Sequence, residues 1–535
     1  MRTQRFRFAV GRSVRRSAPR GLAALLFSIQ FAVCAGADSN AVSRADAWWT
    51  PNSGRVFPAR TTYTDPSGTV TVISTAGETN TSGHAFFTAI GRNGRACVTC
   101  HQPLDGMSVS VPTIQARWQA TQGKDPLFAA FDGSNCPTLP QQEASSHSLL
   151  LQRGLFRIAR PWPPRSPEGA TIEPQFTIEV VHDPSGCNLD PRYGLKAPHP
   201  MVSVFRRPRP VANLKYVTAF GYVFEPKNGL PLPLDPRTGL RYSGNLLADQ
   251  RARTLEEQAL DALDNHLEMP GKPTDEQMRQ IVSFESTLFV AQSADQRGGA
   301  LTDAGAKGGP DELAAAKPGV LKSSQNPQWS EFASWAVAAT AAATNATAVN
   351  AVATNVVAAS ATTPADQAAF RASVARGAAL FRDRTFLISD SAGLNSMNFG
   401  NPTRDSCNFC HNMTRTGMDV APGQVDLGTT NEPFADPAPD LPLFKLTCAE
   451  RFPPQPFLGR VVYTHDPGFA LTTGKCADIG RITIQQMRGL AARAPYFSNG
   501  SARTLRDVID YYDRRYHIGY SEQDKQDLTN LMSVL

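Results

Sequence analysis

The chain has 535 residues, and its formal net charge is +6 at pH 7. This length exceeds what one hydrophobic core organises, so two or three domains are expected. The first 20 residues hold seven Arg and no acid, so the rest of the chain is close to −1. The positive net charge of the chain therefore comes from its first 20 residues. It gives no support for binding to nucleic acid or to a membrane surface.

The N-terminus has the pattern of a secretory signal peptide. The apolar stretch 21–33 follows the Arg-rich start, and Ala35-Gly36-Ala37 provides an A-x-A cleavage signal. We predict a signal peptide over residues 1–37 and export to a bacterial periplasm. Cys34 leaves with this peptide, and the bulky Val33 before it disfavours a lipoprotein site.

The first predicted domain spans residues 38–292. Residues 112–131 have the pattern of a helix that runs into a loop. A Pro-rich insertion over about 132–215 contains alternating runs at 176–181 and 202–205, which predict short strands. Two helices are expected at 252–268 and 274–292, separated by Pro270 and Pro273.

Residues 293–365 are predicted to be a linker. Its first part is rich in Gly, Pro and Lys, and its second part, from Phe332 to Ala365, is Ala-rich and uncharged. Thr and Asn interrupt the Ala-rich part every few residues, and Leu, Ile and Phe are nearly absent from it. Ala and Thr add little transfer energy, so no membrane span is expected. An Ala-rich linker helix that ends at Pro364 is the preferred interpretation.

The second predicted domain spans residues 366–535. It is expected to open with a helix from about Gln367 that includes Val374–Phe381, and to end with helices at 503–516 and 521–535. The chain shows no extended periodicity, so it is not a repeat array.

The pattern Cys-x-x-Cys-His occurs twice, at residues 97–101 and 407–411. It is the attachment site of c-type haem, in which the two thiols add to the vinyl groups and the His ligates the iron. A zinc site would need four convergent ligands, and a redox dithiol needs no trailing His. The motifs predict two covalently bound haem c groups, held by Cys97, Cys100, His101, Cys407, Cys410 and His411.

Four further cysteines remain after the signal peptide and the motifs are set aside. An even number in an oxidising compartment predicts disulfides. Sequence order favours Cys136 with Cys187 and Cys448 with Cys476, out of three possible pairings.

Three segments of the chain resemble the bacterial dihaem cytochrome c peroxidase family, which includes the oxidase MauG. They are residues 93–103 around the first motif, 252–269, and 488–505, which contains Arg-Ala-Pro-Tyr-Phe. The resemblance covers most of the chain outside the insertion and the Ala-rich linker. It implies a mainly α fold of two cytochrome c-like haem domains, with the β-containing insertion in the first.

The resemblance implies that peroxide reacts at the N-terminal haem. The distal Gln and Glu of the family lie ten residues apart, and Gln258 and Glu268 have that spacing. A carboxylate can move a proton between the peroxide oxygens as base and then acid, while an amide orients the peroxide. The alternative is a solvated acidic helix face. His266 stands where the family commonly has Pro. A surface role, or a place behind the residues that contact the haem, is the preferred interpretation of it, and a distal ligand in a closed form or an extra proton carrier are the alternatives.

The resemblance also implies the second iron's sixth ligand. Most family members use a Met at a place that falls on Tyr512 here, whereas MauG has Tyr. A thioether favours Fe(II), and a phenolate favours higher oxidation states. Tyr512 is therefore the expected ligand, with Met487 and Met418 as rivals and simple packing of Tyr512 as the alternative.

Two other positions depart from the family. Ser498 replaces a His, and Ala248 aligns with the Trp that bridges the haems. Electron transfer between the haems would therefore need another route, through Tyr242 or directly from haem to haem, with Trp329 and Trp335 as further candidates. The family also holds a calcium ion between its domains. The backbone carbonyls of Arg493 and Pro495 match part of that site.

These observations favour a periplasmic dihaem peroxidase-like oxidoreductase that reduces hydrogen peroxide. The second haem would store or relay electrons, including through a state with both irons as Fe(IV), and a c-type cytochrome or cupredoxin would be the donor. The alternatives are a MauG-like oxidase of a specific protein or organic substrate, and a plain dihaem electron carrier. No obvious second His lies near the first motif, which argues for an open first haem.

Overall fold

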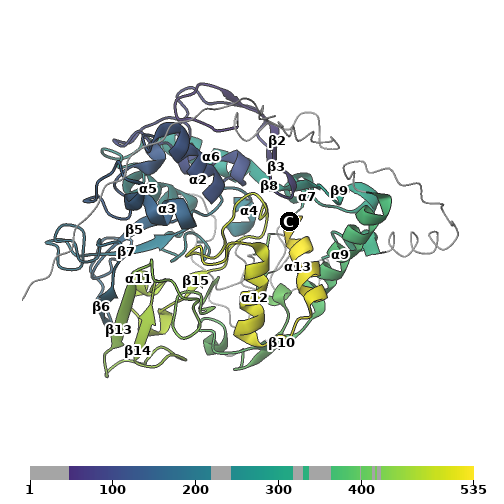
Figure 1. The fold of residues 1–535 in the computed structure, drawn as a ribbon. Coiled ribbons are helices and arrows are strands. Elements are labelled where there is room, and N and C mark those ends of the chain that lie inside the picture. Colours follow the sequence, from purple (N-terminus) through teal and green to yellow (C-terminus); the bar gives the residue numbers. More distant parts are fainter. Residues whose placement is uncertain are drawn as a thin grey trace, which may run out of the picture. The chain divides into compact units, whose positions relative to one another are not determined.

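The computed structural model describes residues 47–218, 242–316, 329–336, 363–397, 399–411, 416–417 and 423–535 (Figure 1). The predicted signal peptide, most of the Ala-rich segment and Met418 lie outside the described residues. The expectations made for them stay predictions.

The described strands form several small antiparallel sheets (Figure 1). The largest has the order β2-β3-β8-β9, and a three-stranded sheet has the order β14-β13-β6. The others are pairs, β1-β4, β5-β7, β10-β11 and β12-β15. The strands are β1 Val56–Phe57, β2 Arg60–Thr64, β3 Gly68–Ser74, β4 Thr79–Asn80, β5 Phe156–Pro161, β6 Phe176–His182, β7 Met201–Arg206, β8 Leu288–Asp295, β9 Gly299–Ala300, β10 Phe386–Ile388, β11 Thr403–Asp405, β12 Gln424–Val425, β13 Leu443–Cys448, β14 Val461–Thr464 and β15 Ile482–Thr483.

The helices are short apart from α9, which has 20 residues. They are α1 Cys97–Cys100, α2 Val111–Thr121, α3 Ser148–Arg153, α4 Leu214–Val217, α5 Leu255–Asn265, α6 Asp275–Thr287, α7 Pro310–Ala315, α9 Pro364–Asp383, α10 Cys407–Cys410, α11 Ala470–Thr473, α12 Leu505–Tyr516 and α13 Glu522–Ser533. Single 3-10 turns are η1 Pro103–Asp105, η2 Pro126–Phe128, η3 Ala144–His147, η4 Asp303–Gly305, η5 Asn395–Met397 and η6 Cys476–Asp478.

The prediction of a mainly α fold made of two cytochrome c-like haem domains is wrong. Helix makes up only 31% and strand 18% of the described structure, and the strands lie in several small sheets. Strand pairing between distant segments, such as β3 with β8 and β6 with β13, accounts for the difference. Local sequence pattern does not encode such pairing, because it depends on which segments meet in space.

Side-chain caps explain where the longer helices begin. The Thr254 hydroxyl accepts from the Glu257 backbone N–H at the start of α5, and Thr274 does the same for Gln277 at the start of α6. Thr363 caps α9, with Pro364 as the first helical residue. A capping hydroxyl satisfies one of the N–H groups that the first turn leaves without an intrahelical partner. Pro364 therefore begins a helix, and most of the segment it was expected to end lies outside the described residues.

The local predictions around the insertion are largely confirmed. The runs at 176–181 and 202–205 are in β6 and β7, and the helices expected at 252–268 and 503–516 are α5 and α12. The helix expected over 274–292 stops at Thr287, and Leu288–Asp295 is instead β8. Residues 288–292 are mostly apolar and pair with β3, so the tertiary partner decides their conformation.

The insertion also contacts the C-terminal part of the chain. β6 pairs with β13 in antiparallel register, with Leu446 opposite Ile178. One hydrophobic core combines Leu214, Val217 and Leu246 with α9, α12 and α13. The two predicted domains therefore share a sheet and a core, while the boundaries at residues 292 and 366 stay a prediction.

Among the described helices, none has both the length and the apolar character that a membrane crossing requires.

Candidate functional site

Each Cys-x-x-Cys-His motif folds as a four-residue helix that is capped by its His. His101 Nδ1 lies 3.1 Å from the carbonyl oxygen of Met107, and His411 Nδ1 lies 2.7 Å from that of Gly417. A carbonyl only accepts, so Nδ1 carries the proton and donates in both motifs. The lone pair of Nε2 is then free, which is the form in which an imidazole ligates a metal.

Burial keeps both imidazoles neutral. It lowers the pKa of His101 to about 4, against the opposing effect of the Met107 carbonyl, and it lowers the pKa of His411 in the same way. A neutral imidazole with a free nitrogen suits iron ligation. The two motifs therefore present the same donor set.

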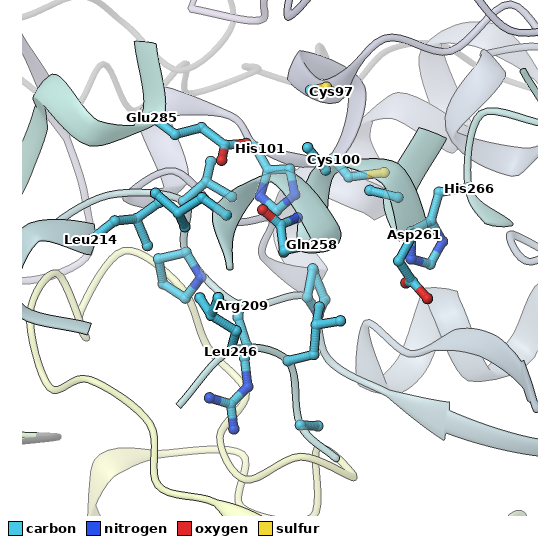
Figure 2. A pocket seen from close by; sticks show the side chains of 18 of the residues that line it. Cys97, Cys100, His101, Arg209, Leu214, Leu246, Gln258, Asp261, His266 and Glu285 are labelled. Atoms are coloured by element: carbon cyan, nitrogen blue, oxygen red, sulfur yellow. The ribbon is translucent and has the colours of Figure 1, made fainter. Parts of the chain in front are cut away.

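The first motif lines a largely apolar cavity, here called the first cavity (Figure 2). Figure 2 shows His101, Gln258 and Glu285 converging near the centre of the view, with Asp261 and His266 to one side. Helix α5 supplies Leu255, Gln258, Ala259, Asp261 and Ala262, and its cap supplies His266. Gln258 therefore lines the same cavity as the first motif, and the catalytic role expected for it stays a prediction.

The second motif lines a separate cavity, here called the second cavity. Tyr512 and Met487 both line it, so two of the three expected ligand candidates are at hand. Tyr512 is half-buried, and its ring stacks on Tyr516 with a centroid distance of 6.3 Å. Burial, reinforced by Tyr516, raises the pKa of the Tyr512 phenol well above its ordinary value. The phenol is therefore neutral here, and a bound cation would be needed to hold it as phenolate.

Four residues line both cavities and form a shared wall: Arg207, Pro208, Gln485 and Gln486. None of the four is aromatic. Ala248, which aligns with the family's bridging Trp, lines only the first cavity. Tyr242, Trp329 and Trp335 line neither cavity, so none of them lies in the described wall between the motifs.

A buried ionic network fixes the first cavity from the side of β7. Arg206 donates to both carboxylate oxygens of Asp466 at 2.6 and 2.8 Å, and to Asp249 at 2.7 Å. Arg251 joins Asp249 at 2.7 Å and holds both oxygens of Asp261 on α5. The network connects segments that are more than 200 residues apart in the sequence.

Three other arginines at the cavities have no ion pair with a carboxylate among the described residues: the buried Arg207 and Arg493 and the partly buried Arg209. Arg209 donates to the carbonyls of Thr483 and Ile484, and its buried Nε has no partner. Burial, together with neighbouring arginines, lowers the pKa of Arg207 to about 10 and of Arg209 to about 9, and burial lowers that of Arg493 to about 10. An anionic ligand at these cavities would supply the missing counter-charge.

These features fit haem c. Each cavity presents two thiols and one neutral imidazole, as thioether attachment and iron ligation require. The carboxylates of a haem would pair with the guanidinium groups of Arg207, in the shared wall, and of Arg209, which have no carboxylate partner among the described residues. When bound, the haems would supply redox-active iron to both cavities.

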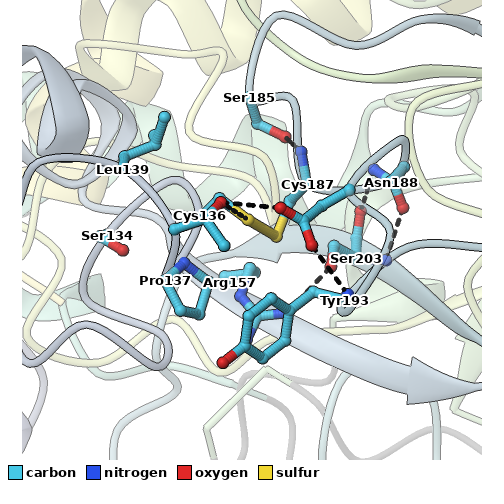
Figure 3. Close-up of a disulfide and its surroundings, with 12 residues drawn as sticks. Ser134, Cys136, Pro137, Leu139, Arg157, Ser185, Cys187, Asn188, Tyr193 and Ser203 are labelled. Atoms are coloured by element: carbon cyan, nitrogen blue, oxygen red, sulfur yellow. Dashed lines mark hydrogen bonds between the residues drawn. A yellow bond between two sulfur atoms is a disulfide. The ribbon is translucent and has the colours of Figure 1, made fainter. Parts of the chain in front are cut away.

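The cysteines divide as the sequence predicts. Cys97, Cys100, Cys407 and Cys410 are free. The disulfides Cys136–Cys187 and Cys448–Cys476 confirm the predicted pairing, and Figure 3 shows the first beside Tyr193 and Arg157. The thiols that haem attachment needs are therefore the ones left unpaired.

Glu268 lies outside the lining of the first cavity. Its Oε2 accepts from the Nδ2 of Asn93 at 3.1 Å, and its carbonyl accepts from the Arg92 N–H. The structure thus brings Gln258 to the motif but directs Glu268 toward the segment that precedes it. The role expected for Glu268 stays a prediction.

Sequence reasoning missed Glu285 on α6. This residue is 2% exposed, it lines the first cavity, and within the described residues its Oε2 has no hydrogen-bond partner. Burial raises its pKa to about 8. The signal was available, because Glu285 follows Met278 by seven residues and Ile281 by four, on the apolar face of α6.

The calcium site implied by the resemblance stays a prediction, and one contact argues against it. The carbonyl of Arg493 already accepts from Nη2 of Arg207 at 2.8 Å, and the same nitrogen donates to Val109. A calcium ion at that carbonyl would lie beside a buried guanidinium with no anion between them. In the described residues, no group of three His, Cys, Asp or Glu side chains could hold a metal ion.

Comparison of the chain with protein-family models, with curated proteins and with solved structures finds no match.

The raised pKa of Glu285 predicts a pH-dependent stability. Between its ordinary pKa and about 8, the folded state keeps the proton and the unfolded state loses it, so stability falls as pH rises. Between pH 5 and pH 8 this group should lower the free energy of unfolding by on the order of 4 kcal/mol. Glu285→Gln should remove that part of the decline, measured by denaturant unfolding at both pH values. Glu276→Gln, on the exposed side of α6, is the control and should keep it.

The guanidinium at the Arg493 carbonyl predicts that the protein does not bind calcium between the cavities. The melting temperature and visible spectrum of the haem-loaded protein should be the same with excess calcium and with excess EGTA. Isothermal titration with calcium should show no saturable heat. One equivalent of calcium that survives dialysis and moves the spectrum would contradict this expectation.

Proposed function

We propose that this protein is an exported dihaem c-type oxidoreductase, which reduces hydrogen peroxide at the first cavity and stores or relays electrons at the second. The proposal keeps the resemblance to the dihaem peroxidase family as its guide to chemistry. It does not depend on the cytochrome c-like domain fold, which the structure lacks.

The difference between the two cavities carries this proposal. The first is lined by the Gln258 amide and contains no Met, and its second imidazole, His266, is held by Asp132. The second is lined by Tyr512 and Met487, either of which can ligate iron. An iron with an open position beside an amide suits peroxide binding, and an iron closed by a side chain suits electron storage or transfer.

The chemistry that the protein must manage is proton and electron supply. Reduction of one hydrogen peroxide takes two electrons and two protons and yields two waters. The Gln258 amide can donate to one peroxide oxygen and accept from the other, which orients the molecule. A small c-type cytochrome or a cupredoxin would supply the electrons, and the four residues of the shared wall separate the two cavities.

Oxidation of a specific protein or organic substrate is the second candidate, and Tyr512 is the observation that favours it. A phenolate ligand stabilises oxidised iron, so a second cavity closed by Tyr512 would hold an oxidising equivalent better than it would pass electrons. The reduction potential of the second haem separates the candidates, because Tyr ligation lowers it and Met ligation raises it.

The test is EPR of the ferric protein before and after one equivalent of hydrogen peroxide. We expect two haems by pyridine haemochrome assay, with one high-spin signal that disappears on peroxide addition. Cys97→Ala with Cys100→Ala should remove that signal and leave the other. Two low-spin signals that do not respond to peroxide would instead identify a plain electron carrier.

Glu268→Gln tests the carboxylate inferred from the resemblance. If Glu268 turns into the cavity to move the peroxide proton, the variant should keep both haems and lose about a hundredfold or more in peroxide turnover. Asp264→Asn, on the exposed side of α5, is the matched control and should turn over normally. Normal turnover in Glu268→Gln would remove this residue from the mechanism.

A further inference from the structure

His266 caps α5, and its imidazole lines the first cavity (Figure 2). Its Nδ1–H donates to Oδ2 of Asp132 over 2.6 Å, and within the described residues no hydrogen bond engages Nε2. A carboxylate that holds Nδ1–H fixes the tautomer and orientation of the ring and stabilises its protonated form. His266 therefore has the hydrogen bonding of a general acid and base.

The pair of Asp132 and His266 is held by the segment that precedes the first motif. The side chain of Asp132 is 1% exposed and pairs with the guanidinium of Arg95 through its other oxygen. Arg95 and Asn93 also donate to the backbone carbonyl of His266, at 3.1 and 2.8 Å. Burial opposes ionisation of Asp132, but Arg95 and His266 outweigh it and hold the pKa of this carboxyl below its ordinary value. Asp132 is therefore a fixed negative charge behind the imidazole.

Exposure distinguishes His266 from the other proton-carrying groups of the cavity. Its side chain is 27% exposed, so it meets solvent as well as the cavity. Asp261 is bound at both oxygens by Arg251, and Glu285 is buried. Among the described lining residues, His266 is thus the titratable group that combines solvent access with an unused nitrogen.

Charged and titratable groups surround the His266 imidazole. The groups that face it are Asp132 and Arg95 from the loop segments, Asp261 from its own helix and His101 from the first motif. Two of these groups are carboxylates and one is a guanidinium, while His101 is neutral. Arg95 is itself paired with Asp132. The His266 ring therefore lies among fixed charges of both signs.

We propose that His266, oriented by Asp132, delivers protons from solvent to the first cavity. The inference rests on the proposed function, since peroxide reduction is the reaction that consumes two protons there. In each delivery, Nε2 takes a proton from a solvent hydronium or buffer acid and releases it to an oxygen in the cavity. The Nδ1–H stays on its bond to Asp132 throughout. Two deliveries and two electrons from the donor protein balance the conversion of one peroxide to two waters.

The first test uses His266→Gln, which keeps an amide able to donate to Asp132 but cannot carry a proton. The rate at which peroxide changes the visible spectrum of the first haem, followed by stopped flow against pH, should fall about tenfold or more. The imidazole ionisation in that pH profile should disappear. His199→Gln, an exposed histidine elsewhere, is the control and should leave the profile unchanged. An unchanged rate and profile in His266→Gln would overturn the inference.

A second test asks whether Asp132 acts as a positioning residue for His266. Asp132→Asn removes the negative charge behind the ring, so the imidazole ionisation in the profile should move to lower pH. The wild-type profile provides a check that needs no variant. If the wild-type rate shows no ionisation in the pH range where imidazoles ordinarily titrate, the inference fails. This result does not depend on whether a variant folds.

Cyanide separates this inference from the proposed function. Hydrogen cyanide must lose a proton to bind ferric haem as an anion, and a base in the cavity accelerates that loss. His266→Gln should slow cyanide association about tenfold or more, whether or not the protein reduces peroxide. If peroxide is not reduced but cyanide association slows, the proposed function fails and the proton route stands. Equal cyanide association in both proteins would reject the route while leaving peroxide reduction intact.

Discussion

The buried pairing of Arg206 with Asp249 and Asp466 is the interaction on which the arrangement of the first cavity depends. These side chains are almost fully inaccessible, and Arg206 uses three of its donors on the two carboxylates. A buried charge is tolerated only when it is paired, and removing one partner of such a pair costs about 3–5 kcal/mol. The network therefore holds β7, the segment before α5 and the loop after β14 in one fixed relation.

That relation determines what the motif at residues 97–101 can meet. Arg251 extends the network from Asp249 to Asp261, so α5 is docked with Gln258 and His266 on the cavity. From the other side, Arg95 and Asp132 clamp the end of α5 to the segment before the motif. The short helix α1 thus lies among side chains that are positioned by charge pairs, in surroundings that are otherwise apolar.

The two motifs are alike in their donors and unlike in their surroundings. His101 and His411 each donate Nδ1–H to the carbonyl six residues ahead, so each presents the same free nitrogen. The first cavity adds an amide, an Asp-held imidazole and a buried carboxyl, whereas the second adds tyrosines and methionines. Two motifs with the same donors therefore lie in chemically different surroundings, and they are separated by only the shared wall.

The sequence by itself determined the six motif residues, the pairing of the other four cysteines, the Gln258 position and most helix starts, because short-range spacing and capping chemistry set these features. Only the tertiary structure decided the fold class, the strand at Leu288–Asp295, the turn of Glu268 toward Asn93, and the placing of Glu285 and His266 on the cavity. Each of these depends on partners far away in the sequence, such as β3 for β8 and Asp132 for His266. Burial and pairing between distant segments leave only weak traces in local pattern, so such features emerge when the chain is folded.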